Sequence, residues 1–220
     1  MPDANVPPVQ RQGRRADALR NSDRIVRAAI VVLRDSGPAA SLDEIARRAG
    51  IGIATLYRRF GDRDGVIRAA FQTYFAEEIE PLALAARDAP DPGRRLVDAL
   101  TATVDTLAAH HALLGAAQES GGFTVDIAER FMGPLAGVLA AAQRRGQVRA
   151  DLLVRDLAAI VVMALATVHP GDPAHADPRR YLALLLDGLR PSAGTLPAPS
   201  DTRLRVDSPD PDLGEARSSS

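Results

Sequence analysis

The chain has no cysteine, no lysine and no tryptophan, and aromatic residues make up only 4% of its 220 positions. Without cysteine, neither a disulfide framework nor a thiolate metal site can form, which fits a reducing compartment. The amino terminus lacks the apolar core of a secretion signal. The longest uncharged apolar run, residues 157–168, is only twelve residues long and therefore too short to span a bilayer. These absences predict a cytoplasmic protein with no membrane partner.

Sequence motifs of enzyme active sites are missing as well. The chain has no phosphate-cradling glycine loop, no nucleophile elbow and no helical carboxylate–histidine motif. His110 and His111 are adjacent, so they lie about 100° apart on a helix and cannot share a ligand. His169, Asp172 and His175 share one loop, but the cysteines or helical histidine pair of a metal site are lacking. We therefore expect no enzyme, no metal site and no cofactor.

Charge is distributed unevenly along the chain. Residues 1–60 hold eleven arginines against six acidic residues, whereas residues 61–220 hold sixteen arginines against twenty-two acidic residues. A basic beginning on an acidic remainder is typical of a nucleic-acid binder that has a second role elsewhere. Apolar residues make up 46% of the chain, and its abundant alanine and leucine favour helices around a sizeable core.

Two amphipathic helices are predicted after a flexible basic arm over residues 1–20. Apolar residues at i, i+3, i+4 and i+7 begin at Ile25, and Gly37 ends this first helix. The second helix begins with a capping box, in which Ser41 and Glu44 can satisfy the free N–H groups of the first turn. Its apolar face follows the same spacing, so both helices can pack on a common core.

The connector Gly50-Ile51-Gly52 leads into a third helix with two different faces, predicted over residues 53–60. One face is apolar, and the other displays small or polar side chains that include Arg58 and Arg59. Two helices joined by a short glycine turn and braced by a first helix make a helix-turn-helix. The alternative is a surface helix with two solvated arginines. The capping box, the glycine turn and the basic local charge together favour DNA binding.

Several side chains of this unit suit contacts with a DNA duplex. Arg58 and Arg59 can pair with phosphates or with O6 and N7 of guanine, and the Tyr57 hydroxyl can reach a phosphate. Ser41 at the start of the second helix, and Arg63 at the start of a fourth helix, can hold phosphates as well. The predicted DNA-binding residues are Ser41, Ile53, Ala54, Thr55, Tyr57, Arg58, Arg59 and Arg63.

The rest of the chain also has helical periodicity, without the alternation of a strand. The fourth helix is expected over residues 63–80. Later helices are expected over about 94–110, 112–119, 125–145, 152–168 and 178–189. From Pro191 onward, five prolines and six serines in thirty residues predict a disordered tail.

The stretch from Ser41 to Gly65 resembles the signature of the tetracycline-repressor (TetR) family of regulators. The step Thr55-Leu56-Tyr57, followed by Phe60-Gly61, is the most specific part of the match. The resemblance implies an all-α homodimer of about nine helices per subunit, with a three-helix DNA-binding head and a helical body for ligand binding and dimerisation. Family members often carry a polar residue at the position of Ile53, which here either packs internally or touches a thymine methyl.

These implications translate into domains of residues 1–20 (arm), 21–80 (helix-turn-helix domain with the linking helix), 81–190 (body) and 191–220 (tail). The last two helices of the body are apolar on more than one face, which a twofold mate would cover. A monomer in which both helices are central is the alternative. The predicted dimer interface is Leu157, Ile160, Val161, Leu165, Tyr181, Leu182, Leu185 and Leu189. A ligand pocket, which the resemblance implies, would draw on Leu100, Val104, Leu107, His111, Gln118, Phe131, Met132 and Met163.

Together these features predict a sequence-specific, DNA-binding transcriptional regulator. We expect a repressor that a small-molecule effector releases from a palindromic operator of double-stranded DNA. Two alternatives stay open at this point. One is a helical small-molecule-binding protein or enzyme with an incidental basic head, and the other is a DNA-binding protein without sequence preference.

Overall fold

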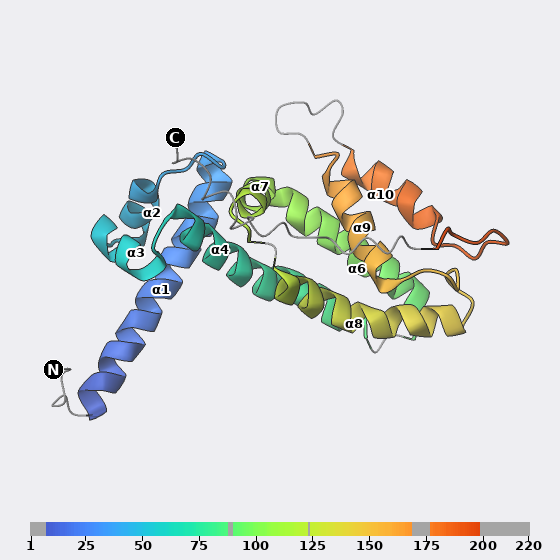
Figure 1. The fold of residues 1–220 in the computed structure, drawn as a ribbon, viewed down its shortest axis with the longest axis horizontal. Coiled ribbons are helices and arrows are strands. Elements are labelled where there is room, and N and C mark those ends of the chain that lie inside the picture. The colour runs from blue at the N-terminus through green and yellow to red at the C-terminus, as the bar shows by residue number, and fades with distance from the viewer. Residues whose placement is uncertain (1–7, 88–89, 123, 169–176, 199–220) are drawn as a thin grey trace, which may run out of the picture.

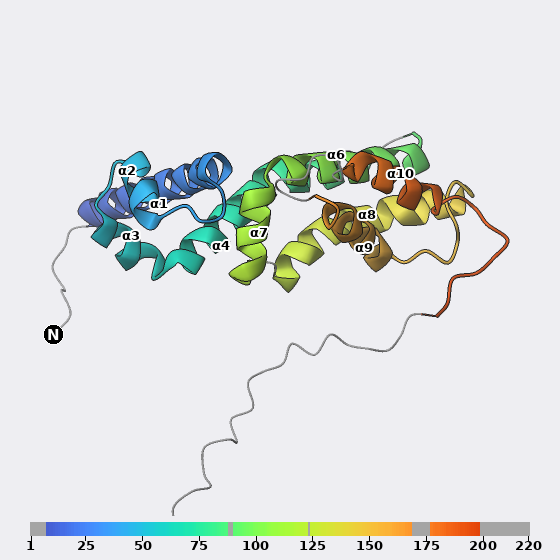
Figure 2. The ribbon, with the colours of Figure 1, turned by 90° about the horizontal axis from the view of Figure 1, so that it is seen from above.

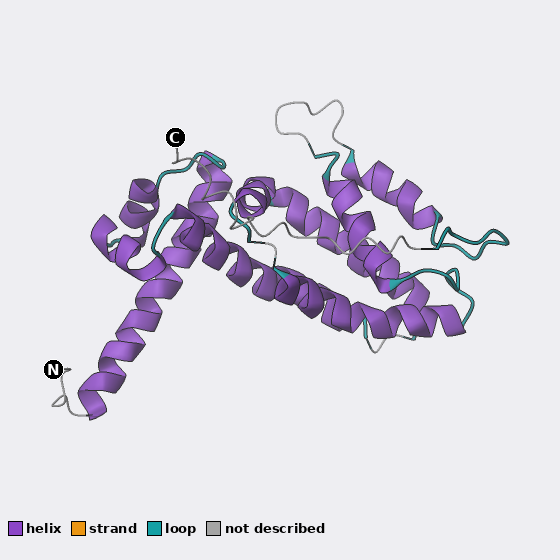
Figure 3. Ribbon diagram, in the orientation of Figure 1, coloured by secondary structure: helices purple, strands orange, loops and turns teal. Residues whose placement is uncertain are grey.

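The structure is a computed structural model that describes residues 8–87, 90–122, 124–168 and 177–198. Across these ranges the chain is helical, with no strand (Figure 3). The helices are α1 (Pro8–Ser36), α2 (Leu42–Ala49), α3 (Ile53–Phe60), α4 (Arg63–Tyr74), the π-helix η1 (Phe75–Ile79), α5 (Glu80–Ala85), α6 (Pro92–Ala109), α7 (His111–Glu119), α8 (Val125–Arg144), α9 (Val154–Leu165) and α10 (Pro178–Asp187). The predicted all-α fold class is confirmed.

The segments α4, η1 and α5 follow one another without a break, so they form one rod from Arg63 to Ala85. Counted this way, the described ranges contain nine helical rods, as expected. Pro81 explains the π-helix in the middle, because proline has no N–H and its ring crowds the carbonyl four residues earlier. A wider turn just before a proline relieves both conflicts. The predicted end of this helix at residue 80 is therefore wrong, and the rod continues into the body.

Figure 1 shows two parts joined by this rod. The head consists of α1 to α4, with α2 and α3 beside the middle of α1. The body consists of α6 to α10, and Figure 2 shows it extending from the head along the direction of α4. One apolar core runs through both parts and includes Phe71 of α4 and Leu100 of α6, each with 0% exposure. No helix in the described ranges combines the length and apolar character that crossing a membrane requires.

Polar contacts hold the head against the body where α7 meets α4. The Tyr74 hydroxyl donates to the Thr106 carbonyl at 2.8 Å and lies 2.9 Å from Nδ1 of His110. Burial raises the pKa of this phenol, and the nearby Glu78 carboxylate raises it further. Arg68 of α4 donates to the carbonyl of Ser120 at the end of α7 (3.1 Å). The rod is therefore fixed to both α6 and α7.

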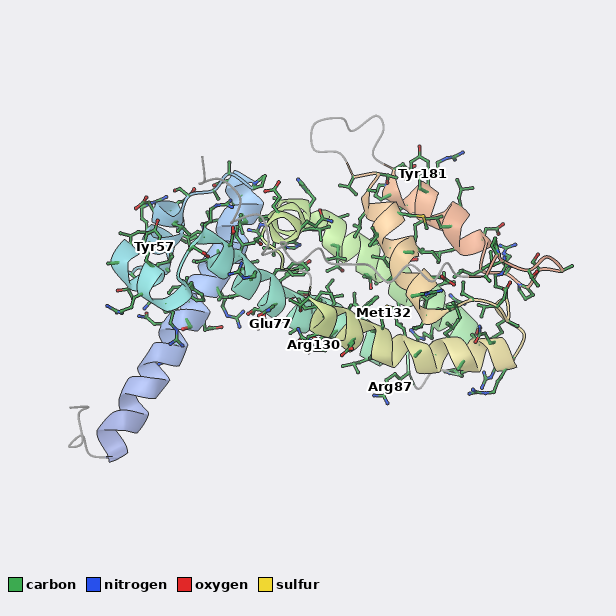
Figure 4. All side chains as sticks on the ribbon, viewed as in Figure 1. Tyr57, Glu77, Arg87, Arg130, Met132 and Tyr181 are labelled. Atoms are coloured by element: carbon green, nitrogen blue, oxygen red, sulfur yellow. The ribbon has the colours of Figure 1, made fainter. Side chains whose placement is uncertain are left out.

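The first turn of η1 is tied to α1 by a second contact. Arg27 of α1 donates to both carboxylate oxygens of Glu77, at 2.9 and 3.2 Å. The pair is bidentate, which gives it a defined geometry although both side chains are half exposed. The pair links α1 of the head directly to η1. Figure 4 labels Glu77 of this pair.

Both ends of the chain differ from the prediction. Helix α1 begins at Pro8, so residues 8–20 are helical and do not form a flexible arm. Their alanine, leucine, arginine and glutamine are strong helix formers, and a helix already begun extends easily. At the other end, Arg149 and Asp151 form an ion pair at 2.6 Å that also binds the backbone of residues 194 and 196. The start of the predicted disordered tail is thus docked on the body.

The Arg149 guanidinium holds the pKa of the Asp151 carboxyl far below its usual range, and the backbone N–H of Leu196 acts in the same direction. We therefore expect the contact between Asp151 and residues 149 and 196 to persist in mild acid. The remainder of the predicted tail, residues 199–220, lies outside the described residues, as does the loop with His169, Asp172 and His175.

Candidate nucleic-acid interface

Local capping determines where α2 begins and ends. Ser41 accepts a hydrogen bond from the backbone N–H of Glu44 at 3.2 Å. The Glu44 carboxylate accepts from the Ser36 hydroxyl at 2.9 Å, which ties α2 to the end of α1 instead of completing the predicted capping box. Gly50 ends the helix with φ of 65°, a left-handed conformation that glycine adopts without strain. These signals all lie within a few residues of the helix, so the sequence reveals them.

Helix α3 has the two faces that its sequence predicts. Leu56 is fully buried, and Ile53 and Phe60 pack against the core while partly buried. On the other side Ala54, Tyr57, Arg58 and Arg59 are exposed, Thr55 is half-buried, and half of the Tyr57 surface is accessible. Figure 4 shows Tyr57 on the side of the head that faces away from the body. Ile53 was expected either to pack internally or to touch a thymine methyl, and in the structure it packs against the core.

The step from α3 to α4 depends on Gly65. Asp62 caps α4 by accepting from the N–H of Gly65 at 2.6 Å. A Cβ atom added to Gly65 would lie 2.0 Å from the carbonyl oxygen of Phe60, the last residue of α3. Such a separation is far inside van der Waals contact. The close approach that sets the orientation of α3 therefore requires glycine at this position.

The three arginines predicted to contact DNA differ in their surroundings. Arg59 donates from Nε to the Ser22 hydroxyl of α1 at 2.6 Å. Arg63 donates to the carbonyl of Pro38, in the loop that precedes α2. Arg58 is exposed and makes no side-chain hydrogen bond or ion pair to the described part of the chain. Of the three guanidinium groups, that of Arg58 keeps all its donors available.

Ser41, Arg63 and the exposed face of α3 all belong to the head, but Ser41 is already engaged as a helix cap. The sequence missed the partner of Arg59, because Ser22 lies 37 positions earlier in the chain. No local spacing connects these two residues.

A second exposed surface lies on the last two helices. Four large apolar side chains are open to solvent there: Val162 (59%) and Met163 (48%) of α9, and Tyr181 (42%) and Leu184 (64%) of α10. We name these four residues the body surface; Tyr181 is labelled in Figure 4.

Most residues of the predicted dimer interface are covered within the subunit. Leu157, Ile160, Val161, Leu182 and Leu189 are buried within the subunit, whereas Leu165 and Leu185 are partly buried and Tyr181 is exposed. The two helices pack against each other and against α6, so their most apolar sides face inward. The sequence showed more apolar surface than one face needs, but not which side the subunit itself would cover.

The eight residues predicted to line a ligand pocket differ in burial. Leu100, Val104, Leu107 and Phe131 are core residues, Met132 is partly buried, and His111, Gln118 and Met163 are exposed. A groove of about 590 Å³ lies elsewhere, between α6 and α10, and none of the eight predicted residues lines it. Helices α6 and α8 pack against each other, and the apolar residues of these helices on which the prediction relied are mostly buried.

The fold is matched by known proteins. A TetR transcription regulatory protein from Mycobacterium vanbaalenii is 31% identical, and the match covers 80% of this chain and 98% of that one with a TM-score of 0.55. This chain belongs to the TetR family of transcriptional regulators. The family model for the amino-terminal part of bacterial tetR regulatory proteins matches residues 25–70. The model for the carboxy-terminal domain of SbtR-like transcriptional regulators matches residues 91–191.

Two further proteins are similar to this TetR-family regulator, one in sequence and one in fold. An HTH-type transcriptional regulator of Mycobacterium tuberculosis is 29% identical over 164 residues, which cover 71% of this chain and 84% of the relative. FadR from Bacillus subtilis, solved in complex with stearoyl-CoA, has a TM-score of 0.56 at 19% identity and covers 76% of this chain and 98% of its own; it shares the fold. The resemblance inferred from residues 41–65 is thereby confirmed, as is the function of a DNA-binding transcriptional regulator.

Proposed function

We propose that this regulator binds a palindromic operator through α3 of two subunits, with the eight residues predicted from the sequence forming or flanking the contact. The observation that carries the proposal is the pair of faces on α3. Its buried Leu56 anchors the helix, while Tyr57 and Arg58 are exposed on the opposite side. A helix of this kind can enter a major groove about 12 Å wide without disturbing the core beneath it.

The three arginines have different roles in this proposal. Arg58 reads a base, because a guanidinium without protein partners can place two donors on O6 and N7 of guanine. Arg59 contacts a phosphate, since its bond to Ser22 restrains the side chain and leaves other donors free. Arg63 and the start of α2 hold the backbone on the other side of the turn. Ala54, Thr55 and the Tyr57 hydroxyl complete the contact.

Dimerisation in this proposal uses the body surface. Solvated side chains as apolar as Val162 and Leu184 gain free energy when a second copy covers them. A twofold axis makes the same surface complementary to itself and relates the two heads. Two related heads match the two half-sites of a palindrome.

The predicted release by an effector fits the continuous rod from Arg63 to Ala85. A ligand changes DNA affinity only if it prefers one arrangement of the heads over another. The rod carries the turn that supports α3 at one end and packs within the body at the other. Its contacts through Tyr74, Arg68 and Glu77 would transmit a shift of the body to the head. We propose a repressor whose operator-bound state lacks effector, and which acts as a regulator and not as an enzyme.

The proposal is tested by selecting duplexes from a random DNA pool with the full-length chain and titrating the selected site. We expect a palindromic site with two half-sites about one helical turn apart. Arg58→Ala should weaken binding by about 1–3 kcal/mol and relax specificity at one position in each half-site. The matched control is Arg144→Ala, which removes an exposed arginine from the body. A pool without sequence enrichment, or equal effects of both variants, would contradict the proposal.

A further inference from the structure

The groove between α6 and α10 has the dimensions of a small-molecule site. Its volume of about 590 Å³ falls in the range of ligand pockets, about 300–1,000 Å³. The two helices run in opposite directions along it, because Arg179 at the start of α10 bonds to Asp105 near the end of α6. The lining residues come from α6 and its N-cap (Asp91, Gly93, Arg94, Val97, Thr101), the loop after α8 (Gln147, Val148) and α10 with its end (Arg179, Leu182, Ala183, Leu186, Asp187, Leu189, Arg190).

The middle of the groove is apolar. Val97, Leu182 and Leu186 line it along the two helices, with Ala183 at the exposed edge. From Arg94 to Thr101 the α6 side spans seven residues, or about 10 Å at 1.5 Å per residue. A short hydrocarbon body can therefore lie along the groove over the buried Leu182 and cover the partly exposed side chains of Val97 and Leu186.

Charged groups surround this apolar strip, and all but one make a hydrogen bond or an ion pair within the protein. Asp91 accepts from the backbone N–H of Arg94 at 3.1 Å and from Gln147 at 2.8 Å. Asp187 pairs with Arg190 at 2.9 Å. Arg179 pairs with Asp105 through two bonds of 2.9 and 3.0 Å, one to each carboxylate oxygen.

The exception is Arg94. Within the described ranges its guanidinium makes no hydrogen bond or ion pair, and it is exposed at one end of the groove. A guanidinium presents parallel N–H donors that match a carboxylate in a bidentate fork. The groove thus combines an apolar strip with one guanidinium that has no side-chain partner, near the Asp91 carboxylate, whose own hydrogen bonds come from neutral donors.

We propose that this groove binds an amphipathic monocarboxylate, with the carboxylate on Arg94 and the hydrocarbon body along Val97 and Leu186. The site is separate from the DNA contact and does not depend on it. It also stays open in the proposed dimer. Leu184 is two positions from both Leu182 and Leu186, so it projects about 200° away, on the opposite side of α10.

Isothermal titration calorimetry of the full-length, DNA-free chain with octanoate tests the site. We expect one octanoate per subunit. Arg94→Ala should weaken binding by about tenfold or more, the effect of losing a hydrogen-bonded charge. The matched control is Arg95→Ala, because Arg95 is exposed in the next position and does not line the groove. Octylammonium, with the same chain and opposite charge, should not bind.

A second variant tests the location independently of charge. Ala183→Phe places a ring over the apolar strip from an exposed position, so the fold should be retained and octanoate binding lost. No binding by wild type, equal binding by wild type and Arg94→Ala, or undiminished binding by Ala183→Phe would each overturn the proposal. None of these results bears on the operator, because the DNA selection uses ligand-free protein.

Discussion

The head and the body of this regulator expose opposite kinds of surface. On the head, α3 presents Tyr57 and Arg58, a polar and basic pair of side chains above a fully buried Leu56. On the body, α9 and α10 present Val162 and Leu184, with 59% and 64% of their surface in contact with water. The first surface suits a polyanion and the second suits another apolar surface. One chain with a net charge of −1 thus carries two binding faces, which its average composition does not reveal.

The two surfaces also differ in how they are supported. The head surface depends on a few local backbone features, chiefly the glycines and caps at the ends of α2, α3 and α4. The body surface is what remains after long helices have packed against one another. An added Cβ at Gly65 should therefore disable the head, whereas an added Cβ at Gly115 of the body should be tolerated.

The largest expected effect comes from Gly65→Ala in the head. The added Cβ would meet the Phe60 carbonyl oxygen at 2.0 Å, so the turn between α3 and α4 must shift. We expect a loss of about 3 kcal/mol in the free energy of unfolding, together with loss of operator binding. Chemical denaturation and DNA titration measure the two effects.

The body offers a matched glycine. Gly115, inside α7, has no atom within 4 Å of an added Cβ, so Gly115→Ala should stabilise the protein by about 0.5–1 kcal/mol through helix propensity. If Gly65→Ala proves as stable as wild type, the expected contrast between Gly65 of the head and Gly115 of the body fails.

The next effect concerns the body surface. Leu184→Glu would place a charge on the body surface. It should weaken dimerisation by about 2 kcal/mol without loss of helicity. Leu84→Glu alters a residue of similar exposure (47%) on α5 and should leave the dimer intact. Sedimentation velocity across a dilution series distinguishes the two. Unchanged dimerisation of Leu184→Glu would assign the interface to another face.

A smaller effect is expected within the head surface. Arg59→Ala should weaken DNA binding by about 1 kcal/mol on all sequences alike and reduce the salt dependence by about one counterion. Arg58→Ala should instead change the base preference. Binding measured at several salt concentrations on the selected site and on a scrambled site separates these results. A change in base preference with Arg59→Ala would contradict the role inferred from its bond to Ser22.

The smallest effect is expected at the junction between head and body. Tyr74→Phe removes the bond to the Thr106 carbonyl and should lower the free energy of unfolding by about 1 kcal/mol at neutral pH. Because burial raises the pKa of Tyr74, the native state keeps a proton that the unfolded chain loses. Wild-type stability should then decline as pH rises above about 10, and the variant should decline less. Equal slopes in denaturation between pH 9 and 11 would contradict this account.

Much of the head could be predicted from the sequence because its signals are local. Ser41, Gly50 and the apolar spacing of α2 and α3 act over at most seven residues, and the structure has both helices where they were expected. The first helix was misjudged because its residues 8–20 lack a clear apolar stripe, although they favour helix. The bond between Arg59 and Ser22 could not be predicted, since it joins positions far apart in the chain.

The body helices were also predicted close to their observed bounds, but their faces were not. A helix such as α9, apolar on several sides, does not reveal from its sequence which side a neighbour will cover. Leu157 and Val161 are buried while Val162 is exposed, and hydrophobicity alone does not distinguish them. For the same reason, four of the eight predicted pocket residues belong to the core, and none of the eight lines the groove between α6 and α10.

The all-helical fold, the helix-turn-helix and the family could be inferred from the sequence, because capping, glycine turns and apolar periodicity act over one or two helical turns. The tertiary structure alone decided which apolar residues reach solvent, which arginine stays without a partner and where a cavity opens. Those properties depend on which helices pack together, through contacts between residues tens of positions apart. Arg94 and Arg95 show the difference, because the sequence presents them as equals and only packing places one of them at a groove.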